Sequence, residues 1–250
     1  MSKIKSILNL VNKFKKNDTK KNASLSLFGN LLYSVLGFVG IALLARSLPL
    51  NEYGDWVIYL TAGSLLEMMR LGFIHTALVR FSSGSTETEQ KEYIASGWII
   101  GILFSMILSF TIFSVFLVVY FFEIKTSYYY FLMYYPIFTM IGLPISVSLS
   151  ILQFKIQFAK ILRMRFTNMS LNIMVFLSAY FFKLHVETVI QLHLISTFTS
   201  SLNACLFSLE TMVKPIRLLS QPQSPNPAIY LTFIFFLYLY FAFFSWLKIK

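Results

Sequence analysis

The chain has 250 residues, of which 57% are apolar and 12% are charged, and it carries 27 phenylalanines and a formal net charge of +11. Soluble domains carry about 25% charged residues, and a soluble chain of this composition would expose large apolar patches and aggregate. The composition therefore excludes an ordinary soluble domain and indicates an integral membrane protein.

The distribution of charge and of reactive side chains excludes further classes of protein. The basic residues lie between apolar segments, as in cytoplasmic loops, and not along one surface that a nucleic acid could occupy. No phosphate loop of the GxxxxGKS or GxxxxGKT type is present, and His75, His185 and His193 lie far apart without metal-ligand spacing. We therefore expect no nucleic-acid partner, no metal or other cofactor and no catalytic residues. The one cysteine, Cys205, excludes an intrachain disulfide.

Residues 1–21 form a basic segment with seven lysines. Its apolar residues recur at helical spacing, at positions Ile4, Ile7, Leu8, Val11 and Phe14. This pattern predicts an amphipathic cytoplasmic helix on the anionic inner leaflet, with membrane lipids as its partners. The alternative is a disordered basic tail that only sets the orientation of the chain.

Seven segments are long and apolar enough to cross a bilayer core of about 30 Å, which takes about 20 helical residues. They are Ala23–Ala45, Asp55–Val79, Ile94–Phe122, Tyr128–Leu152, Phe166–Phe182, Thr188–Ser208 and Ala228–Leu247. Pro136 and Pro144 predict kinks in the fourth segment. The expected fold class is all-α, a polytopic transmembrane helix bundle of about six to seven spans.

The loops also predict the orientation and the domains. Fifteen of the 21 Lys and Arg residues fall in segments that a cytoplasmic N-terminus would place inside, and five fall in segments that it would place outside. The N-terminus is therefore expected in the cytoplasm. Residues 22–215 are expected to form a six-helix transmembrane lobe, 216–227 a linker that contains the Pro-rich stretch SQPQSPNP, and 228–250 an aromatic-rich C-terminal span.

The second span carries an acid and a base near its middle. Glu67 and Arg70 are three residues apart and so share one face of a helix. A charge at that depth costs at least about 2.5 kcal/mol, so it should face protein or a wet cavity. One interpretation is a structural ion pair that fixes helix packing, and the other is a charged cavity wall that meets an anionic substrate. Arg80, at the cytoplasmic end of this span, is more typical of an interfacial anchor.

Two weaker polar stripes recur at helical spacing. Their residues are Ser146, Ser150 and Gln153 in the fourth span, and His193, Thr197, Ser200 and Ala204 in the sixth, with Ser201 and Asn203 close by. Small polar residues commonly join transmembrane helices, which favours a packing role. A substrate path that includes His193 is the alternative.

The order of motifs along the first two spans resembles a known family. The first span ends in LLARSLP, which holds Arg46, and NEYG follows it; the second span carries RLGF and ends in TALVRF. This order is similar to the amino-terminal part of bacterial polysaccharide flippases, the O-antigen and oligosaccharide transporters of the multidrug/oligosaccharidyl-lipid/polysaccharide exporter superfamily. The resemblance covers about residues 22–215.

The resemblance implies a function and a set of candidate residues. Members of this family flip undecaprenyl-pyrophosphate-linked oligosaccharide across the bacterial inner membrane by alternating access between two six-helix lobes. A cationic cavity suits the pyrophosphate, so Arg46, Arg70 and Arg80 become candidate residues of the cavity or its mouths. The family often has an Asp before the LG of the second span, where this chain has Arg70; Glu67 is the candidate to replace that acid.

The resemblance also implies twelve to fourteen spans, about twice the number expected here. The chain would then be one amino-terminal lobe followed by AIYLTFIFFLYLYFAFFSWL, a tail in which we find no motif of the family. One hypothesis is a frameshifted or truncated end that leaves an incomplete flippase. The other is a half-transporter that pairs with a second copy or with a separate second lobe.

Three other classes of function remain as alternatives. A multidrug or cation exporter of the same fold would need buried acids, and Glu67 is the clear one in this lobe. An inactive membrane fragment or scaffold is the second alternative. A membrane glycosyltransferase or polymerase is the third, and it is disfavoured because the expected outer loops are short.

Overall fold

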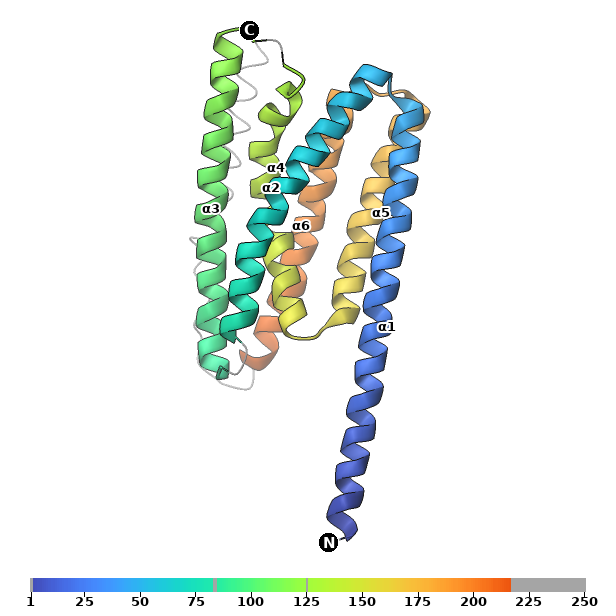
Figure 1. The fold of residues 1–250 in the computed structure, drawn as a ribbon, viewed down its shortest axis with the longest axis vertical. Coiled ribbons are helices and arrows are strands. Elements are labelled where there is room, and N and C mark those ends of the chain that lie inside the picture. Colours follow the sequence, from blue (N-terminus) through green and yellow to red (C-terminus); the bar gives the residue numbers. More distant parts are fainter. Residues whose placement is uncertain (1, 83–84, 125, 217–250) are drawn as a thin grey trace. The chain divides into compact units, whose positions relative to one another are not determined.

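The computed structural model describes residues 2–82, 85–124 and 126–216 (Figure 1). This part of the chain is helical and contains no strand, which confirms the all-α prediction for it. The helices are α1 (Ser2–Ser47), α2 (Leu50–Ser82), α3 (Glu87–Phe121), α4 (Tyr129–Phe154), α5 (Phe158–Phe182) and α6 (Val186–Ile216).

Four helices are long and apolar enough to cross a membrane, which supports the prediction of a membrane protein. The apolar stretches are Ser26–Ser47, Leu50–Leu78, Thr88–Phe121 and Tyr129–Phe154. The 25 residues of α5 and the 31 residues of α6 would extend about 37 and 46 Å at 1.5 Å per residue, so their length also suffices. Both carry more polar residues, and the count of six to seven spans stays a prediction.

The first helix differs from the expected division at residue 22. Backbone helix runs without a break from Ser2 to Ser47, so the basic segment 1–21 and the first span share one helix. No glycine or proline precedes Gly29, so nothing in the sequence stops the helix between the two segments. Where the basic part lies relative to a membrane stays a prediction.

Helix α4 lies among the other helices and is the most buried span. Buried residues make up 61% of its apolar stretch, against 17% for α1 and α3. Pro136 and Pro144 lie inside it and leave carbonyl groups without their helical donors. Hydroxyl groups of two neighbouring helices bind other carbonyl groups of α4: Ser109 of α3 donates to Pro136 at 3.2 Å, and Ser201 of α6 donates to Ile141.

Small residues allow two of the closest helix contacts. A Cβ atom at Gly40 of α1 would lie 2.5 Å from the Phe176 ring of α5, and one at Gly97 of α3 would lie 2.9 Å from Leu78 of α2. Helices that pack through glycine approach more closely than larger side chains permit. The α1–α5 pair at one side of Figure 1 therefore depends on Gly40.

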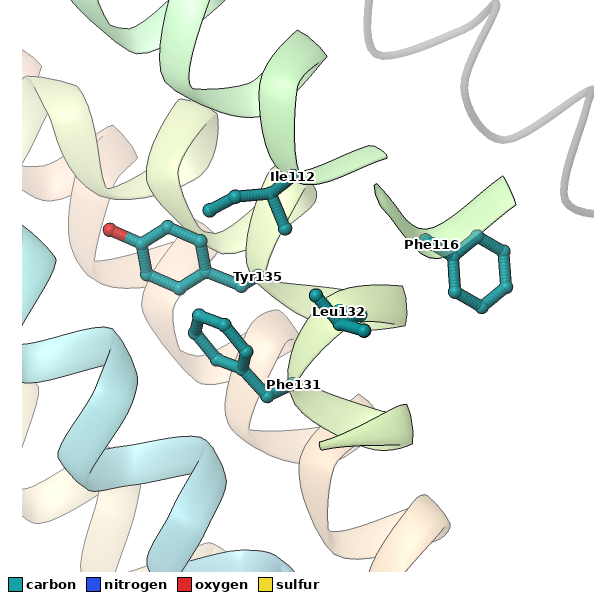
Figure 2. Close-up of a cluster of buried hydrophobic side chains, with 5 residues drawn as sticks. All are labelled: Ile112, Phe116, Phe131, Leu132 and Tyr135. Carbon is teal, nitrogen blue, oxygen red and sulfur yellow. The ribbon is translucent and has the colours of Figure 1, made fainter. Parts of the chain in front are cut away.

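An apolar cluster joins α3 to the first half of α4. Its buried members are Ile112, Phe116, Phe131, Leu132 and Tyr135 (Figure 2). Phe131 and Tyr135 lie 5.1 Å apart between ring centroids, within the range of attractive aromatic pairs. This cluster fixes the end of the bundle at which α3 stops and α4 begins.

The backbone separates into two compact units, Met1–Phe207 and Ser208–Lys250. Apart from Ile216, the predicted linker at 216–227 and the predicted span at 228–250 lie outside the described residues. The site below belongs to the first unit.

Candidate functional site

Arg70 and Glu67 form an ion pair inside α2. The Arg70 side chain is fully buried, and that of Glu67 is 15% exposed. Arg70 Nη2 lies 2.5 Å from Glu67 Oε2, which confirms that the two side chains share a face. Measured from the middle of the stretch Leu50–Leu78, both residues lie within about 10 Å along the helix axis at 1.5 Å per residue.

Neighbouring helices supply the remaining partners of the guanidinium. Nη1 donates to Ser105 Oγ of α3 at 2.9 Å, and to the carbonyl oxygen and Oγ1 of Thr139 of α4 at 2.5 and 3.3 Å. Nη2 also donates to Ser146 Oγ of α4 at 3.1 Å. Hydrogen bonds from a charged donor are stronger than neutral ones. One arginine therefore connects α2, α3 and α4.

Gly142 and Tyr135 of α4 complete the surroundings of the ion pair, in which one guanidinium donor has no acceptor within the part of the chain that the structure describes. A Cβ atom at Gly142 would lie 3.7 Å from Arg70 Nη2, which is an ordinary contact distance. Arg70 Nε is buried and has no hydrogen-bond partner among the described residues. Tyr135 donates to the second oxygen of Glu67 at 3.5 Å. In this conformation the Nε–H group is therefore a guanidinium donor without an acceptor from residues 2–82, 85–124 and 126–216.

The contacts of Arg70 and Glu67 can be compared with the two interpretations of this pair, a structural ion pair and a cavity wall. In this conformation Glu67 compensates the charge of Arg70, and the contacts with α3 and α4 are those of a structural ion pair. An anionic substrate can reach Arg70 only after these helices separate, because the side chain has no exposed surface. The assignment of both residues to a substrate path stays a prediction.

His193 of α6 lies in a separate aromatic cluster. Its side chain is 7% exposed, its ring stacks on Phe138 at 5.6 Å between centroids, and Trp56 meets it edge-on at 5.5 Å. Its Nδ1 atom lies 3.5 Å from the hydroxyl of Tyr59, a weak hydrogen bond. These contacts hold α6 against α2 and α4.

The other two candidate arginines lie at helix ends. Arg46 is exposed in the last turn of α1, and Arg80 is exposed in the last turn of α2. Cations are favoured there because backbone carbonyl groups carry partial negative charge at helix C-termini. Arg80 is ten residues from Arg70, about 15 Å along the helix. The structure therefore places Arg46, Arg70 and Arg80 apart and does not bring them into one cluster.

Glu52 has a partner that the sequence analysis did not anticipate. Its Oε2 atom accepts a hydrogen bond from the backbone N–H of Val186 at 2.8 Å, and its Oε1 lies 3.1 Å from Nδ1 of His185. The first N–H groups of a helix lack intrahelical acceptors, and Glu52 satisfies one of them in α6. The NEYG motif therefore joins the start of α2 to the start of α6.

The two polar stripes join helices only in part, because Ser150 and Thr197 donate to carbonyl groups of their own helices, at 3.1 and 2.9 Å. Ser146 binds Arg70 of α2, and Ser201 of α6 donates to the carbonyl of Ile141. Ser148 donates to the carbonyl of Ala204 at 3.2 Å, although the sequence analysis did not single it out. The prediction of a packing role is confirmed for Ser146 and Ser201.

Within the described residues, Arg70 and Glu67 thus form a buried ion pair in a helix that is long and apolar enough to cross a membrane. No group of three or more His, Cys, Asp or Glu within residues 2–82, 85–124 and 126–216 is arranged to hold a metal ion. No family model, no curated protein and no solved structure matches this chain.

Proposed function

We propose that this chain is the amino-terminal type of lobe of a flippase that moves undecaprenyl-pyrophosphate-linked oligosaccharide across the bacterial inner membrane by alternating access. The resemblance of the motifs around Arg46, Glu52 and Arg70 supports this proposal. The structural observation that carries it is a fully buried arginine, inside an apolar span, whose partners come from three helices. Ionisable residues within membrane spans are functional candidates by default.

Arg70 has the chemistry that a pyrophosphate group requires. A guanidinium donates paired hydrogen bonds in a plane that matches phosphate oxygens, and it stays charged under all physiological conditions. Its present acceptors in α3 and α4 are two serines and Thr139, which a phosphate can replace. We infer that opening of the bundle exchanges these neutral acceptors for phosphate oxygens. The substrate would then stabilise the open conformation, because it binds that conformation more tightly than the closed one.

Glu67 has a matching role when no substrate is bound. A buried arginine without a counter-ion would be strongly destabilising, and Glu67 neutralises it in this conformation. The same pairing disfavours the alternative of a cation exporter, because the acid that would meet a cation is already bound to Arg70. Neither residue has a catalytic role in this proposal, and the protein is not proposed to be an enzyme.

Alternating access in this family takes place between two lobes, so the proposal includes a partner lobe. A second copy of this chain or a separate second lobe would face this one across the substrate path. Arg46 and Arg80 would then lie near the two mouths of that path, since they end α1 and α2 at opposite ends of α2.

The experiment is replacement of Arg70 by Lys in a strain whose surface glycan depends on this protein. Lysine keeps the charge but cannot form the planar pair of bonds, so we expect lipid-linked oligosaccharide to accumulate in the inner leaflet. Arg163→Lys, an exposed position on α5, is the matched control. Normal surface glycan in the Arg70→Lys strain would remove Arg70 from the substrate path. Normal glycan after deletion of the whole gene would remove the flippase proposal.

A further inference from the structure

A hollow of about 450 Å³ lies where α3 ends and the chain turns toward α4. It is lined by Val119, Tyr120, Glu123, Ile124, Thr126 and Tyr129. The lining therefore combines two phenol rings, one carboxylate and the hydroxyl group of a threonine with two aliphatic side chains. None of these residues has a part in the proposed substrate path.

The two tyrosines contact the apolar cluster on one side, and Tyr120 is 41% exposed on the other. The rings of Tyr120 and Tyr129 lie 6.0 and 5.8 Å from the ring of Phe116, measured between centroids. Phe116 is 3% exposed and belongs to the cluster that joins α3 to α4 (Figure 2). Aromatic side chains that are fixed before a ligand arrives lose little conformational freedom when it binds.

The backbone places Glu123 in the wall of the same hollow. Ile124 N–H donates to the carbonyl of Val119 at 3.0 Å, and Glu123 between them has a φ of 49°. This left-handed conformation closes helix α3 and normally favours glycine. The Glu123 side chain is exposed, and it forms no ion pair with any residue that the structure describes. A carboxylate therefore lies beside two aromatic rings in the lining of this hollow.

We propose that this hollow binds an organic ammonium group, with Glu123 as counter-ion and with Tyr120 and Tyr129 as aromatic walls. Aromatic faces attract cations electrostatically, and cages of such rings are a known means of binding substituted ammonium ions. A carboxylate adds an opposite charge, and the hydroxyl of Thr126 adds an acceptor for an N–H donor.

The surroundings indicate a source for this ammonium group. Tyr120 and Tyr128 are 41% and 54% exposed, and Phe121 and Phe122, which follow Tyr120 in the chain, are each 74% exposed. Exposed tyrosines at the end of an apolar span are typical of the membrane–water interface. The headgroup amine of an aminophospholipid would lie at this level, with its acyl chains beside the phenylalanines. A free amine from solution is the second source with the same chemistry.

The test uses the full chain in nanodiscs that contain phosphatidylethanolamine and phosphatidylglycerol in equal amounts. Native mass spectrometry measures which lipids remain bound on release from the nanodisc, with and without ethanolamine in solution. The variants are Glu123→Gln and Tyr120→Leu, and Glu92→Gln is the control because it removes an exposed acid at the other end of α3. Circular dichroism checks that each variant stays folded.

We expect the wild type and Glu92→Gln to retain phosphatidylethanolamine over phosphatidylglycerol, and Glu123→Gln to lose part of this preference, by roughly two- to fivefold, as for an exposed ion pair. Retention that persists in excess ethanolamine assigns the site to a lipid, whereas displacement, with ethanolamine bound, assigns it to a free amine. Equal retention of the two lipids with no bound ethanolamine would overturn the proposal. Unchanged binding in Glu123→Gln would also overturn it. Either result would leave the flippase proposal untouched, because that proposal depends on Arg70.

Discussion

Arg70 and Glu67 lie one helical turn apart on α2 with 2.5 Å between their charged groups, and the arginine is the more deeply buried of the two. The arginine also donates hydrogen bonds to Ser105 of α3 and to Thr139 and Ser146 of α4. The packing of the three helices and the proposed transport function therefore both depend on the side chain of Arg70.

The pair predicts a specific pattern of stability changes. Arg70→Met leaves the Glu67 carboxylate without its cation, and we expect a loss of about 3–5 kcal/mol in the free energy of unfolding. Arg70→Met combined with Glu67→Gln should recover most of this loss, because no unpaired charge remains. Unfolding of the purified variants in detergent measures both values. If Arg70→Met alone is as stable as the double variant, the ion pair does not hold the helices together.

The contact between α1 and α5 predicts different effects at two glycines of the same helix. A Cβ atom at Gly40 would lie 2.5 Å from the Phe176 ring, so Gly40→Ala should destabilise by about 1–3 kcal/mol through overpacking. At Gly37 no atom lies within 4 Å of the added Cβ, so Gly37→Ala should be neutral or stabilising. Thermal unfolding in detergent compares the two. Gly40→Ala combined with Phe176→Leu should be more stable than Gly40→Ala alone, and equal effects of the two single alanines would contradict the contact.

The hydrogen bond from Val186 N–H to Glu52 predicts local behaviour at the start of α6. Glu52→Ala removes the acceptor, and a lost helix cap costs about 1 kcal/mol, which corresponds to roughly fivefold faster opening. Hydrogen exchange at residues 186–189 measures this change. Asp55→Ala, one turn away on α2, is the control and should leave exchange in α6 unchanged. If the two alanine variants exchange alike, Glu52 is not the cap.

The number of spans can be tested at two loops. With a cytoplasmic N-terminus and six spans, Ile156 between α4 and α5 should lie inside, and His185 between α5 and α6 should lie outside. Single cysteines at these positions, in a Cys205→Ser background, can be labelled in whole cells by a reagent that does not cross the membrane. We expect labelling at 185 and none at 156 until the cells are opened. Labelling of neither position in whole cells would show that α5 does not cross.

Composition and hydropathy predicted six described helices and the C-terminal ends of α1 to α5, but they placed the starts of α2, α3 and α5 too late in the chain. The predicted second and third spans, Asp55–Val79 and Ile94–Phe122, correspond to the apolar parts of α2 and α3. The polar extensions of these helices, such as Glu87–Tyr93 in α3, were missed because membrane hydropathy marks the apolar core and not the helix. The capping box of Thr86 and Glu89 is the local sequence pattern that marks this start.

The candidate site was predicted only in part. Helical spacing placed Glu67 beside Arg70, because both lie on one helix. Spacing within one helix cannot identify Ser105 or Thr139 as partners, since these contacts depend on how α3 and α4 pack against α2. The same limit applies to Glu52 and Val186, which are 134 residues apart in the chain. The proximity of Gly142 to Arg70 also follows only from the packing of α4 against α2.

The most direct test of the proposed function measures flipping by a variant that is folded but lacks the arginine. Purified protein with Arg70→Met and Glu67→Gln should unfold at nearly the wild-type temperature, because it leaves no unpaired charge in the core. In proteoliposomes that contain the lipid-linked oligosaccharide, we expect the wild type to move the lipid between leaflets and this variant to fail. A folded double variant that flips at the wild-type rate would contradict the claim that Arg70 meets the pyrophosphate.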